Sequence, residues 1–248
     1  MDKMKSPSLK GLFFRELYLS RKSYISFALI ILLYSVISSL VLLSLKIGNL
    51  SLLEDAEKMH EEMYLMLTYV TSAFCGFFSM TVIDAIHVDM NTKWLGFIYA
   101  SPIKEEKYMA IKFALMLIFN LANIAFSVII GLIFFGIEGA SFTYENFAVI
   151  MCITAVMDIG ISYFAVLSFA FKDMNTASTV FVATFMIFFI SFIIFFITNF
   201  SSKLSAEKVE AFIMSICLKT APFTPFIIIA AFLIGYFISV KFVKRRYK

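Results

Sequence analysis

The chain has 248 residues, of which 61% are hydrophobic and only 15% charged, and its mean hydropathy is +0.92. A soluble domain of this size needs far more polar surface, so the composition excludes a soluble enzyme and predicts a membrane protein. The formal net charge of +4 is small and needs no nucleic acid partner to explain it.

Six apolar stretches follow one another along the chain, each of roughly 20–25 residues. Because a helix rises about 1.5 Å per residue, each covers about 30 Å, the thickness of the hydrocarbon core of a bilayer. The connecting loops are short, so residues 1–248 are predicted to form one all-α membrane domain. The predicted spans are about 24–45, 63–86, 113–137, 147–171, 177–199 and 224–243.

Six spans place both termini on the same side of the membrane, and the basic residues indicate which side. The terminal side would hold sixteen Lys and Arg residues, against five on the other. Because positive charge favours the cytoplasmic side, both termini are predicted to be cytoplasmic. The first apolar run begins after a polar segment and no small-residue cleavage site ends it, so we expect it to be a retained span rather than a signal peptide.

The segment 6–22 is predicted to be an amphipathic helix on the cytoplasmic surface. Ser6 can cap it and Pro7 suits its first turn. An apolar face with basic residues largely off it is typical of an interfacial helix, although a plain basic anchor would also fit. The apolar face consists of Leu9, Leu12, Phe13 and Leu17.

The loop between the second and third spans is long enough to hold a helix of its own. Trp94, Phe97 and Ile98 recur at helical spacing, and Pro102 then restarts a helix. A turn between antiparallel spans needs only a few residues, so the length of the loop favours a docking surface. The alternative is that Trp94 anchors the chain at the lipid headgroups.

An amphipathic outer segment precedes the last span. Pro222 and Pro225 are predicted to break it from that span. Its apolar face consists of Val209, Phe212, Ile213, Ile216 and Cys217.

Two acidic residues lie within the spans. Asp158 is near the middle of the fourth, where an ionised carboxylate is costly and marks a functional hypothesis. Gly160 and Ser162 allow close packing nearby, so a structural polar contact is an equal alternative. Asp84, near the inner end of the second span, is either a solvated helix end or a polar gate.

The fifth span is rich in phenylalanine. Such a surface suits either a route for amphipathic cargo or contact with lipid, and composition does not separate the two. The candidate route residues are Phe181, Phe185, Phe188 and Phe192.

Sequence motifs for catalysis or cofactor binding are absent. None of the nine glycines is followed by Lys, so the chain has no Walker A motif. The three cysteines and two histidines lie far apart, without the spacing of a disulfide framework or metal site. We therefore predict no catalytic residue, metal ligand or cofactor in this chain.

The loop sequence from Asp89 to Trp94, followed by Ser101-Pro-Ile-Lys104 and the segment 107–112, resembles that of small bacterial ABC type-2 exporter permeases. The six spans, the N-terminal amphipathic helix and the amphipathic outer segment are also similar. The resemblance extends over essentially the whole chain and includes exporters of antimicrobial or phenol-soluble-modulin peptides. It implies a permease in a bacterial plasma membrane.

The resemblance also implies partners. Two permease copies, most simply a homodimer, would form a route lined by the second and fifth spans. Two separate ATPase subunits would bind ATP and Mg and drive amphipathic peptide or other hydrophobic cargo outward. The coupling helix would be about Met90 to Tyr99.

Particular residues would make the contact with the ATPase. Trp94, Phe97 and Ile98 would fill its apolar cleft. Asp89, Asn91 and Lys93 would make polar contacts at the rim of the cleft. The second cytoplasmic loop, with Lys172 and Asp173, would make a second, smaller contact.

Other functions compete with an ABC exporter of peptides. An ion-driven secondary transporter predicts interior ionisable groups and spans broken by Gly or Pro. Only Asp158 fits, and no proline interrupts a span. An intramembrane enzyme is disfavoured, because Glu61-Glu62 is not followed by the Arg of a Glu-Glu-x-x-x-Arg protease motif. An exporter of a lipid or small-molecule drug is a further alternative.

Overall fold

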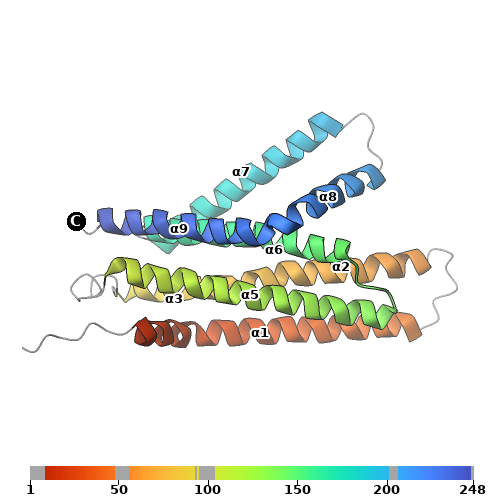
Figure 1. Cartoon of the computed structure of the whole chain (residues 1–248), viewed down its shortest axis with the longest axis horizontal. Helices are drawn as coiled ribbons and strands as arrows, with labels where there is room; N and C mark the ends of the chain where they lie inside the picture. The colour runs from red at the N-terminus through yellow and green to blue at the C-terminus, as the bar shows by residue number, and fades with distance from the viewer. Residues whose placement is uncertain are drawn as a thin grey trace, which may run out of the picture.

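The computed structural model describes residues 9–47, 56–92, 94, 104–171, 173–200 and 206–246. Within these ranges every regular element is helical and there is no strand (Figure 1). In chain order the elements are α1 (Leu9–Ile47), α2 (Ala56–Gly76), η1 (Phe77–Met80), α3 (Thr81–Asn91), α5 (Glu105–Glu138), α6 (Tyr144–Ala170), α7 (Met174–Phe200), α8 (Ala206–Thr220), η2 (Ala221–Phe223) and α9 (Thr224–Arg246).

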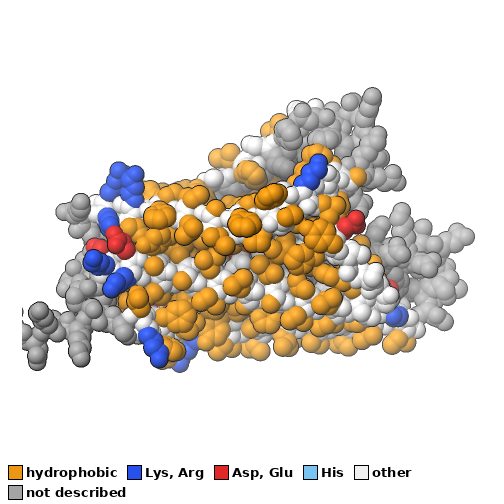
Figure 2. All heavy atoms as spheres, in the orientation of Figure 1, with side chains coloured by type: hydrophobic (Ala, Val, Ile, Leu, Met, Phe, Trp, Pro, Cys, Tyr) orange, Lys and Arg blue, Asp and Glu red, His pale blue; other side chains and the backbone are white. Residues whose placement is uncertain are grey.

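Six helical stretches in the described part of the chain are long and apolar enough to cross a membrane, which confirms the predicted all-α, multi-pass character. Helix α1 begins and α9 ends at the same end of the bundle, which we call the terminal end (Figure 1). Hydrophobic side chains cover the middle of the face in Figure 2, and charged side chains gather at its two ends. This distribution suits a bilayer around the middle of the bundle.

The first helix differs from the prediction of a surface helix over 6–22 followed by a separate span. Helix α1 runs unbroken over 39 residues. No glycine or proline lies between Leu12 and Ile47, so nothing interrupts its backbone hydrogen bonds. Leu12, Glu16 and Ser20 are buried against the bundle, so this segment is part of the helical packing. Residues 6–8 lie outside the described ranges.

The second span contains a break that the sequence did not predict. Helix α2 ends at Gly76, and a single 3-10 turn, η1, links it to α3. A 3-10 segment inside a helix often marks a functional hinge or local strain. The spanning stretch as a whole runs over Met63–Asn91.

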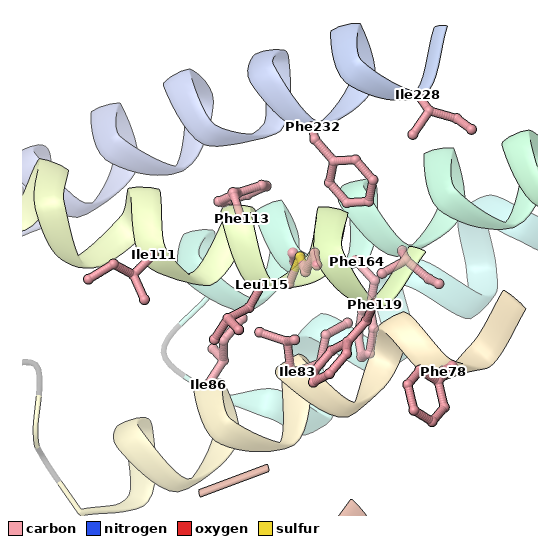
Figure 3. Packing of buried hydrophobic residues seen from close by; sticks show 14 of the residues in the cluster. Phe78, Ile83, Ile86, Ile111, Phe113, Leu115, Phe119, Phe164, Ile228 and Phe232 are labelled. Atoms are coloured by element: carbon pink, nitrogen blue, oxygen red, sulfur yellow. The ribbon is translucent and has the colours of Figure 1, made fainter. Parts of the chain in front are cut away.

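The core centres on α5, with buried side chains of α1, α2, α3, α6 and α9 packed around it. Figure 3 shows Phe113 and Phe119 of α5 pointing toward residues of the neighbouring helices, including Phe164 and Phe232. Helices α6 and α9 approach closely at Gly235, where an added Cβ would overlap Ser162 Oγ. The Ser162 hydroxyl also donates to the Ala231 carbonyl oxygen, at 2.9 Å.

Helix α7 diverges from the bundle in Figure 1 and packs mainly on α6. The predicted break before the last span is confirmed, because α8 ends at Thr220 and η2, which contains Pro222, separates it from α9. On the predicted apolar face of α8, Cys217 is buried whereas Phe212, Ile213 and Ile216 are exposed.

Candidate functional site

Four charged side chains meet at the terminal end of the bundle, where α1, α3 and α5 converge. They are Arg15 and Glu16 of α1, Asp89 of α3 and Lys112 of α5, and we call them the charge cluster. Glu16, Asp89 and Lys112 each have 0% exposed surface. Fully buried charges of this kind are rare unless they are paired.

Each charge in the cluster has partners of opposite sign. Lys112 Nζ donates to Glu16 Oε2 at 2.5 Å and lies 2.8 Å from Asp89 Oδ2. Arg15 pairs with Glu16 Oε1 at 2.5 Å and, through its other terminal nitrogen, with Asp89 Oδ1. The Tyr108 hydroxyl also donates to Asp89 Oδ2.

The cluster contains two positive and two negative groups, so its formal charge is zero. Burying charges is expensive, and that cost is offset here by ion pairs and hydrogen bonds. The partners come from distant parts of the chain, since Arg15 and Asp89 are 74 residues apart and Glu16 and Lys112 are 96 apart. The cluster therefore fixes three helices relative to one another.

Trp94 extends the cluster into the loop that follows α3. The guanidinium carbon of Arg15 lies 4.0 Å from the centroid of the Trp94 ring, which is cation–π geometry. Trp94 is half-buried and packs against the hydrophobic core. The same guanidinium therefore binds the last turns of α3 through Asp89 and the following loop through Trp94.

The other residues predicted to contact an ATPase are only partly described. Asn91 is exposed, and its Nδ2 lies 2.9 Å from His87 Nε2. Asp89 lies inside the cluster, so its carboxylate has no exposed surface in this structure. Lys93, Phe97, Ile98 and Lys172 lie outside the described residues, as does most of the segment predicted to be a coupling helix.

Asp173 has a local structural role at the start of α7. It accepts hydrogen bonds from the Thr176 hydroxyl at 2.6 Å and from the backbone N–H groups of Thr176 and Asn175 at 2.9 and 3.1 Å. These bonds, led by that of the Thr176 hydroxyl, hold the pKa of Asp173 below its ordinary value. This is an N-cap, which satisfies backbone donors that a helix start leaves unpaired.

The candidate route residues divide between the interior and the surface. Asp158 is fully buried and accepts a hydrogen bond from the Asn120 side-chain amide, whereas Asp84 is exposed on α3. Phe181 packs on Phe164 with ring centroids 4.9 Å apart. Phe185 and Phe188 are exposed, and the side chain of Phe192 lies outside the described part.

Sequence reasoning missed Glu16, Tyr108 and Lys112, which complete the cluster. One signal was present: Glu16 is the only acidic residue between positions 3 and 53. It also missed Asn120 and Asn123, which lie one turn apart in the largely apolar middle of α5.

The described side chains include no group of three or more His, Cys, Asp or Glu that could hold a metal ion. No family model, curated protein or solved structure matches the chain. The charge cluster joins α1, α3 and α5 without net charge. Through Trp94 it also holds the loop that follows α3.

Proposed function

We propose that this chain is the transmembrane subunit of an ATP-driven exporter of the ABC type-2 class. In this proposal, two copies form the route and two separate ATPase subunits supply the energy. Both termini and the loop after α3 face the cytoplasm. The observation that carries the proposal is the charge cluster with Trp94 at the base of that loop.

A docking loop transmits force only if its base is fixed to the helices that must move. Arg15 meets this need, because it contacts Trp94 on the loop side and Asp89 on the α3 side. Lys112 then joins Asp89 to Glu16 and so links α3 with α1 and α5. Displacement of the loop by an ATPase would therefore move three helices as one body, as alternating access requires.

Amphipathic or hydrophobic cargo, with a toxin or antimicrobial peptide favoured, suits the apolar surface of α7. Phe185, Phe188 and Ile187 are 56–69% exposed there. Apolar side chains on a helix that packs little within its own chain support a role in the dimer interface and the route. A lipid or a small hydrophobic drug would fit the same surface.

The test is purification of the chain together with the proteins encoded beside it. We expect an ATPase with a Walker A motif to co-purify, and Trp94→Ala to reduce its recovery at least tenfold. Phe226→Ala is the matched control, because Phe226 is a 70% exposed aromatic residue near the start of α9. Full recovery of the ATPase with Trp94→Ala would contradict the assignment of the docking loop.

A secondary transporter driven by ions is the second candidate, because one structural feature favours it. Transporters of that kind bind ions beside discontinuous helices near the middle of the membrane. The η1 break lies in the second span, and the adjacent Gly76 packs against Met157, the neighbour of Asp158. Transport by the purified chain in vesicles, without ATP and under an ion gradient, would favour this candidate.

A further inference from the structure

Asp158 lies at the middle of α6 and has 0% exposed surface. The Asn120 side-chain nitrogen donates a hydrogen bond to its Oδ2. Its other oxygen, Oδ1, has no hydrogen-bond partner among the described residues. A carboxylate in the centre of a membrane is costly unless a charge or a proton neutralises it.

The described residues give Asp158 no ion pair, and the helices packed on α6 offer no free cation at its level. The titratable residues closest to the level of Asp158 are Cys75 on α2 and Tyr236 on α9. Their neighbours Gly76 and Gly235 pack against Met157 and Ser162 of α6. Described α7 has no titratable residue, and Cys217 of α8 lies at Cys152, whose thiol donates to the Cys217 carbonyl oxygen.

Neither the closest basic residue on α5 nor the two acidic residues on α3 neutralise the charge of Asp158. Lys112 lies eight residues, or about 12 Å, before Asn120 and is bound by Glu16 and Asp89. Asp84 on α3 is negative and exposed. No described positive group therefore neutralises an ionised Asp158.

A second polar side chain lies one turn from Asn120 on the same side of α5. Asn123 is 1% exposed, and neither its oxygen nor its nitrogen has a partner among the described residues. An amide with both groups unpaired in the core is costly, and water, which both donates and accepts, satisfies such groups best. We call the packing of α2, α5 and α6 around these side chains the seam. It combines an acid that a proton can neutralise, Asp158, with an amide that water can satisfy, Asn123.

We propose that Asp158 is a proton-binding site, with the proton on Oδ1 while the seam is closed. A proton fits better than a metal cation, because the Asn120 amide hydrogens point at the other carboxylate oxygen and would repel a cation there. When the seam opens to water at the η1 break, the O–H bond of Asp158 breaks and the proton passes to a water molecule. The carboxylate left behind opposes closure until it is protonated again, so closure and proton uptake occur together. The site depends on neither the ATPase nor the docking loop.

The experiment is infrared spectroscopy of the full-length protein in lipid nanodiscs at neutral pH. We expect the carbonyl band of a protonated carboxylic acid in the wild type and its complete loss in Asp158→Asn. This variant keeps an acceptor for Asn120 and resembles the protonated side chain in shape and charge. Asp173→Asn is the control, because Asp173 lies outside the spans and should leave the band unchanged.

Two results would overturn the proposal. One is an identical band region in the wild type and Asp158→Asn, which would mean that Asp158 is ionised. The other is a band that appears only when sodium is removed, which would identify a metal cation as the ligand. Solid-state NMR of wild-type protein labelled with ¹³C-aspartate measures the same protonation without a variant and decides the matter if Asp158→Asn fails to fold. Full recovery of the ATPase with Trp94→Ala, together with the expected band in the wild type, would reject the docking loop and leave the proton site standing.

Discussion

Lys112 lies two turns into α5, has no exposed surface, and binds both Glu16 and Asp89. Lys112→Met would leave two buried carboxylates with Arg15 as the one cation in the cluster. Breaking a buried ion pair from one side costs about 3–5 kcal/mol, so we expect a loss of that order in the free energy of unfolding. Chemical or thermal unfolding in detergent, followed by circular dichroism, measures it.

Lys244→Met is the matched control, because Lys244 pairs with Glu106 where both side chains are 44–47% exposed. We expect little change from this variant. Adding Glu16→Gln to Lys112→Met removes an anion with the cation and should restore part of the stability. If Lys112→Met were no more harmful than Lys244→Met, the cluster would not hold the helices together.

Asp173 gives a prediction of pH dependence. Its pKa is lower in the folded protein than in the unfolded chain, so its contribution is complete above the unfolded value, about 3.9. That contribution is lost as the pH falls through the folded value. We expect the first amides of α7 to lose protection from hydrogen exchange over this acidic range, after correction for intrinsic exchange rates. Asp173→Ala should remove the pH dependence; an unchanged profile in that variant would reject the cap.

At the scale of elements, Arg15 joins α1 to the loop after α3. Trp94 is the only tryptophan in the chain, so its fluorescence reports this contact directly. Arg15→Lys keeps the charge but loses the flat guanidinium that covers the indole. We expect a red shift of the emission maximum as the ring gains contact with water.

Arg21→Lys is the control for this measurement, because the guanidinium of Arg21 covers a different aromatic ring, 3.8 Å from the Tyr18 centroid. Its emission should match that of the wild type. Emission from Arg15→Lys that matched the wild type as well would show that Arg15 does not hold the loop.

The contact between α2 and α6 depends on Gly76. A Cβ there would lie 2.8 Å from Met157 Cβ, a position close to the backbone that cannot swing away. Gly76→Ala should therefore destabilise the fold by about 1–3 kcal/mol. Gly136→Ala is the control, since nothing lies within 4 Å of its added Cβ. A Gly76→Ala variant as stable as Gly136→Ala would contradict the close packing beside the η1 break.

Hydropathy predicted the six spanning helices and Pro222 predicted the break before α9, because both signals are local. The charge cluster could not be predicted in this way. In the sequence, Arg15 and Lys112 are ordinary basic residues near the ends of spans. Their contacts with Glu16 and Asp89 join residues from distant parts of the chain, and no local pattern predicts such contacts. The continuity of α1 was missed for a related reason: the polar residues near Ser20 suggested a surface, whereas Ser20 itself packs inside the bundle.

In the whole molecule, the charge cluster and Asp158 lie at different levels of the same helical bundle. The cluster joins α1, α3 and α5 at the terminal end, whereas Asp158 and Asn120 join α5 and α6 near its middle. Helix α5 contributes to both. Movement imposed on the loop would therefore reach the seam through α5, and the exposed apolar side chains of α7 lie apart from both.

Transport in vesicles that contain the purified chain, with and without its co-purified ATPase, distinguishes an ATP-driven exporter from an ion-driven transporter. We expect outward movement of amphipathic peptide only when the ATPase, ATP and Mg are present, and loss of that movement with Trp94→Ala. Transport by the chain alone, driven by an ion gradient without ATP, would contradict this expectation.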